Sequence, residues 1–301
     1  MKVKAIVNPV SGQNGMRQVT TDVLNRLCAR YKLCENDIYY TSAKNSGRQM
    51  KKSFLEDCDV VMAAGGDGTL HYVVNHMKRL HVDRPIAYLP TGTTNDFGNG
   101  MSLPRTADGF CEMLGHTQTK QIDLGLAGDR YFHYVVAGGA MTAASYTTGQ
   151  HFKNMLGQKA YYLSALFDFR KLLAGAPIEI ESDEFCEEEN AILFLVSNSP
   201  VVGGFQNILP GARFDDGLLH VLVVRKGSVI KTAQTFLDIQ KGSHIGNPDV
   251  LYFTTKKLRI TQHQADAALG IDGERGSART INIGISPHAL TLVVPKLLTA
   301  A

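Results

Sequence analysis

The sequence of 301 residues contains no long hydrophobic run. The longest internal apolar run, Ala191 to Val196, is far shorter than the roughly 20 residues of a membrane-spanning helix. The apolar run near the N-terminus, residues 3–7, is too short for a signal peptide and has no cleavage-site pattern. We therefore expect a soluble, cytoplasmic protein whose contact with a membrane is peripheral and transient.

Cysteine and net charge are also low. The five cysteines are odd in number, scattered along the chain and never spaced as CxxC, which favours reduced thiols in a cytoplasm. A formal net charge of +3 is too small to indicate nucleic acid as a partner, although it permits attraction to an anionic phosphate or membrane surface. With 44% hydrophobic and 20% charged residues, the chain has the composition of a folded protein, long enough for two domains.

Several common nucleotide-binding motifs are missing. The sequence has no GxxxxGK[ST] P-loop and no match to GxGxxG. Asp96-Phe97-Gly98 spells the DFG motif of protein kinases, but no HRD motif accompanies it, so we interpret it as a coincidence.

The first part of the chain alternates strand-like and helix-like segments. Strands are predicted at residues 2–7, 37–41, 60–64 and 85–89, and helices around residues 19–27, after Thr41 and around residues 70–80. The last of these helices has Leu70, Val73, Val74, Met77 and Leu80 on one face. Strands that alternate with helices favour a parallel sheet with right-handed crossovers.

The pattern changes to mainly strands after about residue 124. Strands are predicted at residues 132–137, 178–181, 191–196, 218–224, 250–255 and 258–261, with helices near residues 156–173 and 229–240. We therefore expect an α/β domain over residues 1–124 and a mainly β, sandwich-like domain over residues 125–289. The final apolar run, residues 290–295, could close the second domain or return to the first, so that residues 290–301 would complete the α/β domain.

A glycine-rich turn, Gly65 to Thr69, follows a buried strand and opens an amphipathic helix. Glycines allow a close approach to a ligand, and a helix N-terminus favours phosphate. The charge of Asp67 would repel phosphate unless a divalent cation, Mg²⁺ by its chemistry, lies between them. The alternative is a structural strand-to-helix turn with a capping aspartate.

Two further turns weaken that alternative. Thr91 to Phe97 follows another apolar strand, and Asn8 to Gly12 follows the first strand. The carboxyl ends of neighbouring parallel strands meet at one edge of a sheet, where α/β domains bind ligands. One nucleotide site built from all three turns is therefore expected.

Together the turns resemble those of the diacylglycerol kinase catalytic domain family, soluble bacterial lipid kinases related to sphingosine kinases and NAD kinases. The family's NPxSG, GGDGT and GTxNDF turns correspond to Asn8–Gly12, Gly65–Thr69 and Gly92–Phe97. Later landmarks also match: residues 203–205, 210–212 and 215–218 resemble the segment around the family's structural Mg²⁺ loop, and Asp272-Gly273-Glu274 resembles its DGE motif. The resemblance spans nearly the whole chain.

The resemblance implies an NAD-kinase-like α/β domain, a β-sandwich domain and an ATP- and Mg²⁺-dependent lipid kinase with its active site in the cleft between the domains. The residues that would hold ATP are Asn8, Pro9, Ser11, Gly12, Thr41, Gly65, Gly66, Asp67, Gly68, Thr69, Gly92, Thr94 and Asn95. Asp67, Asp96 and Asp123 would organise the catalytic Mg²⁺, while Arg213, Asp216 and Leu218 would bind a structural Mg²⁺. Glu274 would be the general base, with Asp272 beside it. From the residues alone, Asp216-Gly217 and Asp272 to Glu274 are equally typical of ordinary turns, and Asp123 could simply end a strand.

The chain departs from the family where His71-Tyr72 replaces the usual Asn-Glu and Gly98-Asn99 replaces the frequent Ala-Arg. These changes put the preference for acceptor and nucleotide in doubt more than phosphoryl transfer itself. We expect His71 to be solvated or to stand behind the site, not to bind a metal, because no second His or Cys lies nearby at ligand spacing.

Diacylglycerol is the leading acceptor, with a sphingoid base, phosphatidylglycerol or another hydroxylated lipid as alternatives. The aromatic and aliphatic stretch from residue 152 to 173 could line an acyl-chain channel or rest on a membrane, but such a stretch is more often a helix packed into the core, which we favour. An NAD-kinase-like enzyme and a catalytically silent nucleotide- or lipid-binding regulator remain open as functions. A homodimer is compatible with the sequence, and nucleic acid is not expected as a partner.

Overall fold

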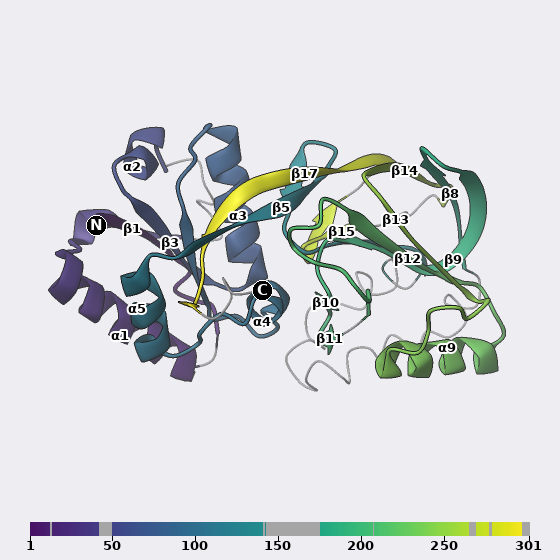
Figure 1. The fold of residues 1–301 in the computed structure, drawn as a ribbon, viewed down its shortest axis with the longest axis horizontal. Coiled ribbons are helices and arrows are strands. Elements are labelled where there is room, and N and C mark those ends of the chain that lie inside the picture. Colours follow the sequence, from purple (N-terminus) through teal and green to yellow (C-terminus); the bar gives the residue numbers. More distant parts are fainter. Residues whose placement is uncertain are drawn as a thin grey trace. The chain divides into compact units, whose positions relative to one another are not determined.

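The computed structural model describes residues 1–12, 14–41, 50–140, 142, 175–206, 208–264, 269–276 and 279–296. The chain divides into two compact units, drawn in Figure 1. We call Met1–Ile122 with His288–Ala301 the α/β unit, and Asp123–Pro287 the β unit. Two strands, β5 (Thr119–Ala127) and β17 (Thr280–Val293), each contain a boundary between the units. The α/β unit is therefore built from both ends of this sequence.

The α/β unit contains a parallel sheet. Its strands are β1 (Val3–Val7), β2 (Ile38–Tyr40), β3 (Val60–Gly65) and β4 (Ile86–Pro90), in the order β17-β4-β3-β1-β2. Each pair is parallel, and the end of β17 joins through Leu292 opposite Ile86. Every residue of β1, β3 and β4 is buried, which explains why the first strands consist of nearly continuous apolar residues.

The helices of this unit follow the predicted periodicity. They are α1 (Asn14–Tyr31), the 3₁₀ turn η1 (Glu35–Asp37), α2 (Lys52–Glu56), α3 (Asp67–Arg79), α4 (Asp96–Gly100) and α5 (Ala107–His116). Helix α3 buries Leu70, Val73, Val74 and Met77, as its spacing predicts, and the half-buried Leu80 follows its last residue. The start of the helix predicted after Thr41 and the one predicted at residues 156–173 lie outside the described residues.

The β unit is mainly antiparallel. Its elements are β6 (Arg130–Phe132), β7 (Val135–Gly138), β8 (Ala176–Ser182), β9 (Cys186–Ser197), β10 (Val201–Val202), β11 (Phe205–Gln206), β12 (Leu219–Arg225), α9 (Val229–Lys241), β13 (Val250–Thr255), β14 (Lys257–Gln262), β15 (Leu269–Ile271) and β16 (Glu274–Gly276). The strand order is β16-β15-β7-β9-β8-β14-β17, and β12 pairs with β9 and β13. The predicted combination of an α/β domain with a parallel sheet and a mainly β domain is therefore confirmed.

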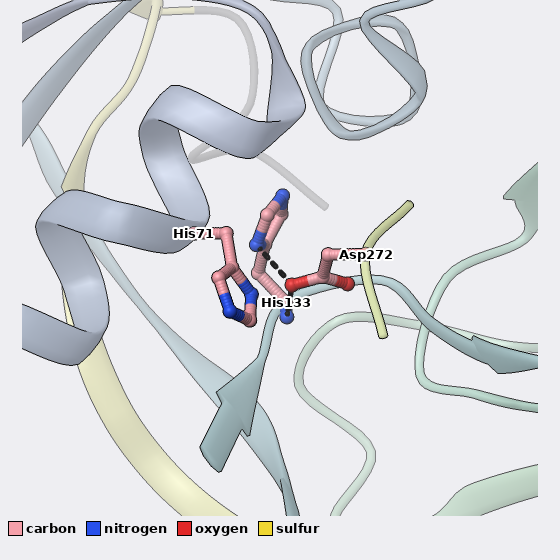
Figure 2. Close-up of side chains that lie close together, drawn as sticks. All are labelled: His71, His133 and Asp272. Atoms are coloured by element: carbon pink, nitrogen blue, oxygen red, sulfur yellow. Dashed lines mark hydrogen bonds and ion pairs between the residues drawn. The ribbon is translucent and has the colours of Figure 1, made fainter. Parts of the chain in front are cut away.

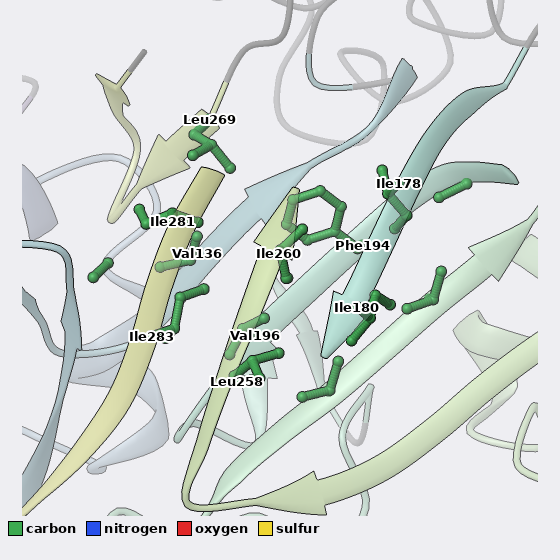
Figure 3. Close-up of a cluster of buried hydrophobic side chains, with 14 of the residues drawn as sticks. Val136, Ile178, Ile180, Phe194, Val196, Leu258, Ile260, Leu269, Ile281 and Ile283 are labelled. Carbon is green, nitrogen blue, oxygen red and sulfur yellow. The ribbon is translucent and has the colours of Figure 1, made fainter. Parts of the chain in front are cut away.

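Strand β12 separates two hydrophobic cores of the β unit. Leu219, Val221 and Val223 join a cluster that includes Val136, Phe194, Ile260 and Ile283, shown in part in Figure 3. Leu222 and Val224 point to the other face, where Ile239 and Phe236 of α9 cover a second cluster. Alternate residues of one strand thus fill two apolar layers, as expected when both faces of a strand are buried.

The strand predicted at residues 132–137 is not continuous in the structure. The run at residues 132–137 is divided, because β6 ends at Phe132 and β7 begins at Val135. Between them, the N–H groups of His133 and Tyr134 donate to the carboxylate of Asp272, at 2.9 and 3.1 Å, rather than to a neighbouring strand. The interruption places Asp272 against the backbone of this segment.

Candidate functional site

The three glycine-rich turns of the α/β unit meet at the carboxyl ends of β1, β3 and β4, as predicted. These strands are neighbours in the sheet and all run in the same direction. The Asn8 Nδ2 atom donates to Thr69 Oγ1 over 3.2 Å, and the Thr91 hydroxyl donates to Ser11 Oγ over 3.4 Å. Thr41, which follows β2, donates its N–H to the carbonyl of Val7 at the end of β1.

The backbones of these turns approach one another closely. A Cβ added to Gly92 would lie 2.5 Å from the Cα of Gly66, so the second and third turns touch at their glycines. A Cβ on Gly12, whose φ is +77°, would lie 2.2 Å from the carbonyl oxygen of Thr91. Larger residues at these points would separate the turns, which makes glycine a requirement of the assembly.

Asp67 lies at the first position of α3 and is buried. Its carboxylate accepts the N–H groups of Asp96 and Phe97, at 3.2 and 3.4 Å, and so caps the start of α4. The structure therefore brings Asp67 and Asp96 together, as predicted. Asn95, at a left-handed φ of +51°, exchanges two hydrogen bonds with the backbone of Gly92 and fixes the intervening turn.

Tyr88 of β4 stabilises the turn that begins at Gly65. Its hydroxyl donates to the carbonyl of Gly65 over 3.2 Å. Burial raises the pKa of Tyr88 well above its ordinary value, and the nearby Asp67 carboxylate raises the pKa further. Tyr88 therefore stays neutral and keeps its hydrogen bond to the turn.

Asp123 and Asp216 are brought together in the β unit. The Asp123 carboxylate accepts the N–H of Gly217 over 2.7 Å, and its backbone N–H donates to the carbonyl of Phe214. Asp216 accepts the N–H groups of Arg213 and Leu218, at 3.0 and 2.9 Å, which closes a tight turn. The predicted structural metal loop is thus an aspartate-rich turn, and Asp123 supports it.

His220 and Tyr252, which the sequence did not indicate, fix the position of the Asp216 side chain. The Nε2 atom of His220 lies 2.9 Å from the Asp216 carboxylate, and its Nδ1 atom lies 2.7 Å from the hydroxyl of Tyr252. That hydroxyl donates to the carbonyl of Pro210. Burial raises the pKa of Tyr252, and Asp216 raises the pKa further, so the hydroxyl remains a donor. His220 follows Asp216 by four residues on the next strand, which is a signal too weak to recognise in the sequence.

Asp272 and Gly273 form the two-residue turn between β15 and β16. Both have positive φ values, +49° and +82°, and Ile271 pairs directly with Glu274, as in a type I′ hairpin. The buried Asp272 carboxylate accepts the N–H groups of His133, Tyr134 and Val135 and also contacts the Nδ1 atom of His133 at 2.7 Å. Figure 2 shows this last contact as a dashed line.

The two predicted catalytic carboxylates of this hairpin therefore lie in different environments. Three backbone N–H groups and the His133 ring surround the carboxylate of Asp272, which holds the turn against residues 133–135. Glu274, two residues later, is exposed at the start of β16. His133 was not singled out in the sequence, because a lone histidine in a β-rich run gives no signal of its own.

Comparison with known proteins adds to this geometry. Residues 2–127 match the model of the diacylglycerol kinase catalytic domain, and residues 134–294 match that of the YegS C-terminal NAD kinase beta sandwich-like domain. A diacylglycerol kinase of Staphylococcus haemolyticus is 30% identical over 299 residues, which cover 97% of this chain and 88% of the relative. The chain belongs to the diacylglycerol kinase family.

Solved structures share the fold of this family member. A candidate diacylglycerol kinase from Bacillus anthracis has a TM-score of 0.81 and 24% identity, with 98% of this chain and 96% of that chain covered. Yeast NADH kinase, in complex with NADH, has a TM-score of 0.56 and 9% identity, with 98% and 84% covered. At these identities the likeness concerns the fold alone, and it confirms the expected NAD-kinase-like architecture.

Membership of the family makes the chain a phosphotransferase of the lipid kinase type, which uses a nucleotide as its phosphoryl donor. The turns of the α/β unit carry oxygen ligands suited to Mg²⁺, and the Asp67 carboxylate contacts the backbone of Asp96. In the β unit, Asp216 accepts two bonds on Oδ2 and one on Oδ1 from described residues, so its carboxylate can still take a cation. Both predicted metal sites therefore fit the ion in their chemistry.

Three remaining predictions concern other parts of this family member. His71 is buried, so the expectation of a solvated side chain is wrong; its Nε2 atom lies 3.4 Å from the amide nitrogen of Asn75, one turn later in α3. The stretch from residue 152 to 173, considered for the acyl chain, lies outside the described residues. Among the helices that the structure describes, each is too short or too polar to cross a membrane.

Proposed function

We propose that this protein transfers the γ-phosphoryl group of ATP, with Mg²⁺, to the free hydroxyl of diacylglycerol at a membrane surface. The observation that carries the proposal is the hairpin of Asp272 and Gly273, whose buried carboxylate is fixed by three backbone N–H groups while Glu274 stays exposed. Membership of the diacylglycerol kinase family supports the substrate class.

ATP is proposed to bind along the three turns of the α/β unit. The touching glycines expose the backbone, and the start of α3 offers the N–H groups that bind phosphate. The residues involved are Asn8, Pro9, Ser11, Gly12, Thr41, Gly65, Gly66, Gly68, Thr69, Gly92, Thr94 and Asn95. Their carbonyl, hydroxyl and amide groups would orient the nucleotide without adding negative charge.

Three aspartates are proposed to hold the catalytic metal ion, namely Asp67, Asp96 and Asp123. Mg²⁺ would neutralise the charge on the β- and γ-phosphates, which is the main requirement of phosphoryl transfer. The carboxylate of Asp216 and the carbonyls of Arg213 and Leu218 would hold a structural ion that stiffens the turn beside Asp123.

Glu274 is proposed as the general base. A lipid hydroxyl is a weak nucleophile, and a carboxylate within hydrogen-bond reach can accept its proton as the oxygen attacks the γ-phosphorus. The bond between the γ-phosphorus and the bridging oxygen then breaks and ADP leaves. Asp272 keeps the turn rigid, so the position of Glu274 is set before the substrate arrives.

The proposal is tested by phosphate transfer from labelled ATP and Mg²⁺ into a panel of lipids in mixed micelles. The panel contains diacylglycerol, a sphingoid base and phosphatidylglycerol, with NAD as a separate acceptor. We expect label in diacylglycerol that is lost in Glu274→Ala, while ATP binding is retained. Labelled NAD would contradict the lipid function, and ATP binding without transfer to any acceptor would indicate a regulator.

A further inference from the structure

Exposed apolar side chains gather on helix α9 of the β unit. Among the described residues, seven large hydrophobic side chains are exposed, and four of them lie on α9 or directly after it. They are Val229, Ile230, Leu237 and Ile245, with Ile230 82% exposed. Exposed apolar residues are ordinary when scattered singly, whereas a cluster of them indicates a contact surface.

The helix carries two apolar faces. One face, with Thr232, Thr235, Phe236 and Ile239, packs on the second core of the unit. At 100° per residue, Val229, Ile230, Ala233 and Leu237 fall within a separate stripe about 100° wide. All four side chains of this stripe are exposed, so it has no role in the core of the described unit. We call this stripe together with Ile245 the α9 surface.

Cations surround the α9 surface. Lys226 precedes the helix, Lys231 lies in its first turn, and Lys241 lies one turn after Leu237 on the same face, all of them exposed. The acidic side chain of the helix, Asp238, accepts hydrogen bonds from the side-chain amides of Gln234 and Asn247. The charge presented next to the apolar stripe is therefore predominantly positive.

This combination fits a lipid surface better than a second copy of the chain. A two-fold interface would pair this surface with itself, so both sides would carry the same excess of positive charge and repel each other. A stable dimer also needs about 800 Å² from each partner, far more than a few side chains of one helix provide. An anionic bilayer, in contrast, attracts the lysines and accepts the apolar side chains between its headgroups.

We propose that the α9 surface docks the protein onto anionic phospholipid membranes. Ile230 and Leu237 insert among the acyl chains, while Lys231 and Lys241 contact the lipid phosphates. The proposal rests on the proposed lipid kinase function, because an enzyme with a diacylglycerol substrate must reach the bilayer that dissolves it. The α9 surface is the part of the protein that reaches the bilayer, and it prefers anionic lipids.

The test measures co-sedimentation of the full chain with vesicles of phosphatidylglycerol and phosphatidylcholine, and with vesicles of phosphatidylcholine alone. In Ile230→Gln/Leu237→Gln we expect the partition coefficient on anionic vesicles to fall by at least about tenfold, since the buried apolar area is lost. In Lys231→Gln/Lys241→Gln it should fall about fivefold per lysine on anionic vesicles and stay unchanged on phosphatidylcholine alone. Matched controls in the α/β unit, Tyr40→Gln and Lys51→Gln/Lys52→Gln, should bind as the wild type does.

Wild-type binding by Ile230→Gln/Leu237→Gln would overturn the proposal. So would a shift from dimer to monomer in that variant without a loss of vesicle binding, because the surface would then be an interface between copies. Phosphate transfer to a short-chain, water-soluble diacylglycerol separates this question from the catalytic one. The docking variants should keep that activity, whereas its absence in the wild type would contradict the proposed function and leave the vesicle result standing.

Discussion

In the α/β unit the candidate residues lie on turns whose backbones touch, whereas in the β unit they lie on turns that carboxylates hold together. Gly66 and Gly92 meet at distances that exclude a side chain. Asp272, in contrast, accepts N–H groups from a segment more than a hundred residues away, and Asp216 accepts those of its own turn. The first arrangement leaves no room for a side chain between the turns, and the second fixes the position of a charged group.

The difference implies that equivalent-looking aspartates have different tasks. Asp67 caps α4 through the N–H groups of Asp96 and Phe97 and is also a proposed metal ligand. Asp272 is buried and accepts three backbone N–H groups, whereas Glu274, the proposed base, is exposed. Substitutions that remove a charge and keep the shape of the side chain can therefore distinguish the roles of these aspartates experimentally.

The largest effect is expected from Asp67→Asn and Glu274→Gln. Each should lower kcat by about a hundredfold or more, through loss of metal binding and of the general base respectively. Only Asp67→Asn should also lower the melting temperature and weaken ATP binding, because Asp67 is buried and caps α4 while Glu274 is exposed. Transfer kinetics and nucleotide titration on both variants check this, and equal stability losses would refute the distinction.

The second effect concerns Asp272→Asn. The amide offers one acceptor oxygen where three backbone N–H groups converge and directs its own N–H groups at the others, so we expect a loss of about 3 kcal/mol of unfolding free energy. Urea denaturation measures the loss. Glu274→Gln is the matched control, since an exposed substitution should change stability by less than about 0.5 kcal/mol. An equally mild Asp272→Asn would show that the turn does not depend on the charge.

The third effect compares glycines of the two units. Gly92→Ala should cost about 2 kcal/mol, because its Cβ would overlap the backbone at Gly66. Gly217→Ala should cost about 1 kcal/mol, since its φ of +70° is strained for alanine but the space around it is open. Reduced ATP affinity is expected only for Gly92→Ala, and nucleotide titration distinguishes the two.

The smallest effect is a pH dependence confined to the α/β unit. His76 is buried in α3; its Nε2 atom lies 2.9 Å from the carbonyl of Met50, and Arg79 lies 2.7 Å from its Nδ1 atom. Burial, and then the charge of Arg79, lower the pKa of His76 in the folded state. The unfolded state therefore binds the proton more tightly, and stability present above pH about 6.5 is lost as the pH falls below it.

Thermal unfolding at pH 7.5 and pH 5 checks this expectation. His76→Gln should lose less stability between these two values than the wild type, because glutamine can make both hydrogen bonds without titrating. The exposed His116→Gln is the control and should behave as the wild type does. The same slope in all three proteins would exclude His76 as the cause.

The sequence alone predicts the fold class and the meeting of the three glycine-rich turns, because these depend on local periodicity and on the geometry of parallel strands. It does not predict the division of the strand at His133, since the cause is Asp272, more than a hundred residues away. The same holds for the support of the Gly217 turn by Asp123. Such contacts join segments that carry no shared pattern, and only the folded chain brings them together.

The passage of the chain through both β5 and β17 has a consequence for synthesis. The β unit is one continuous segment, whereas the α/β unit needs Leu292 at the edge of β4 and the hydrogen bond from Val294 to Gln118. Residues 1–122 thus wait for residues 288–294, which are synthesised after the whole β unit, before their sheet is complete. A nascent chain stopped at Pro287 would hold a finished β unit and an open edge on β4, which is a site for association with other chains.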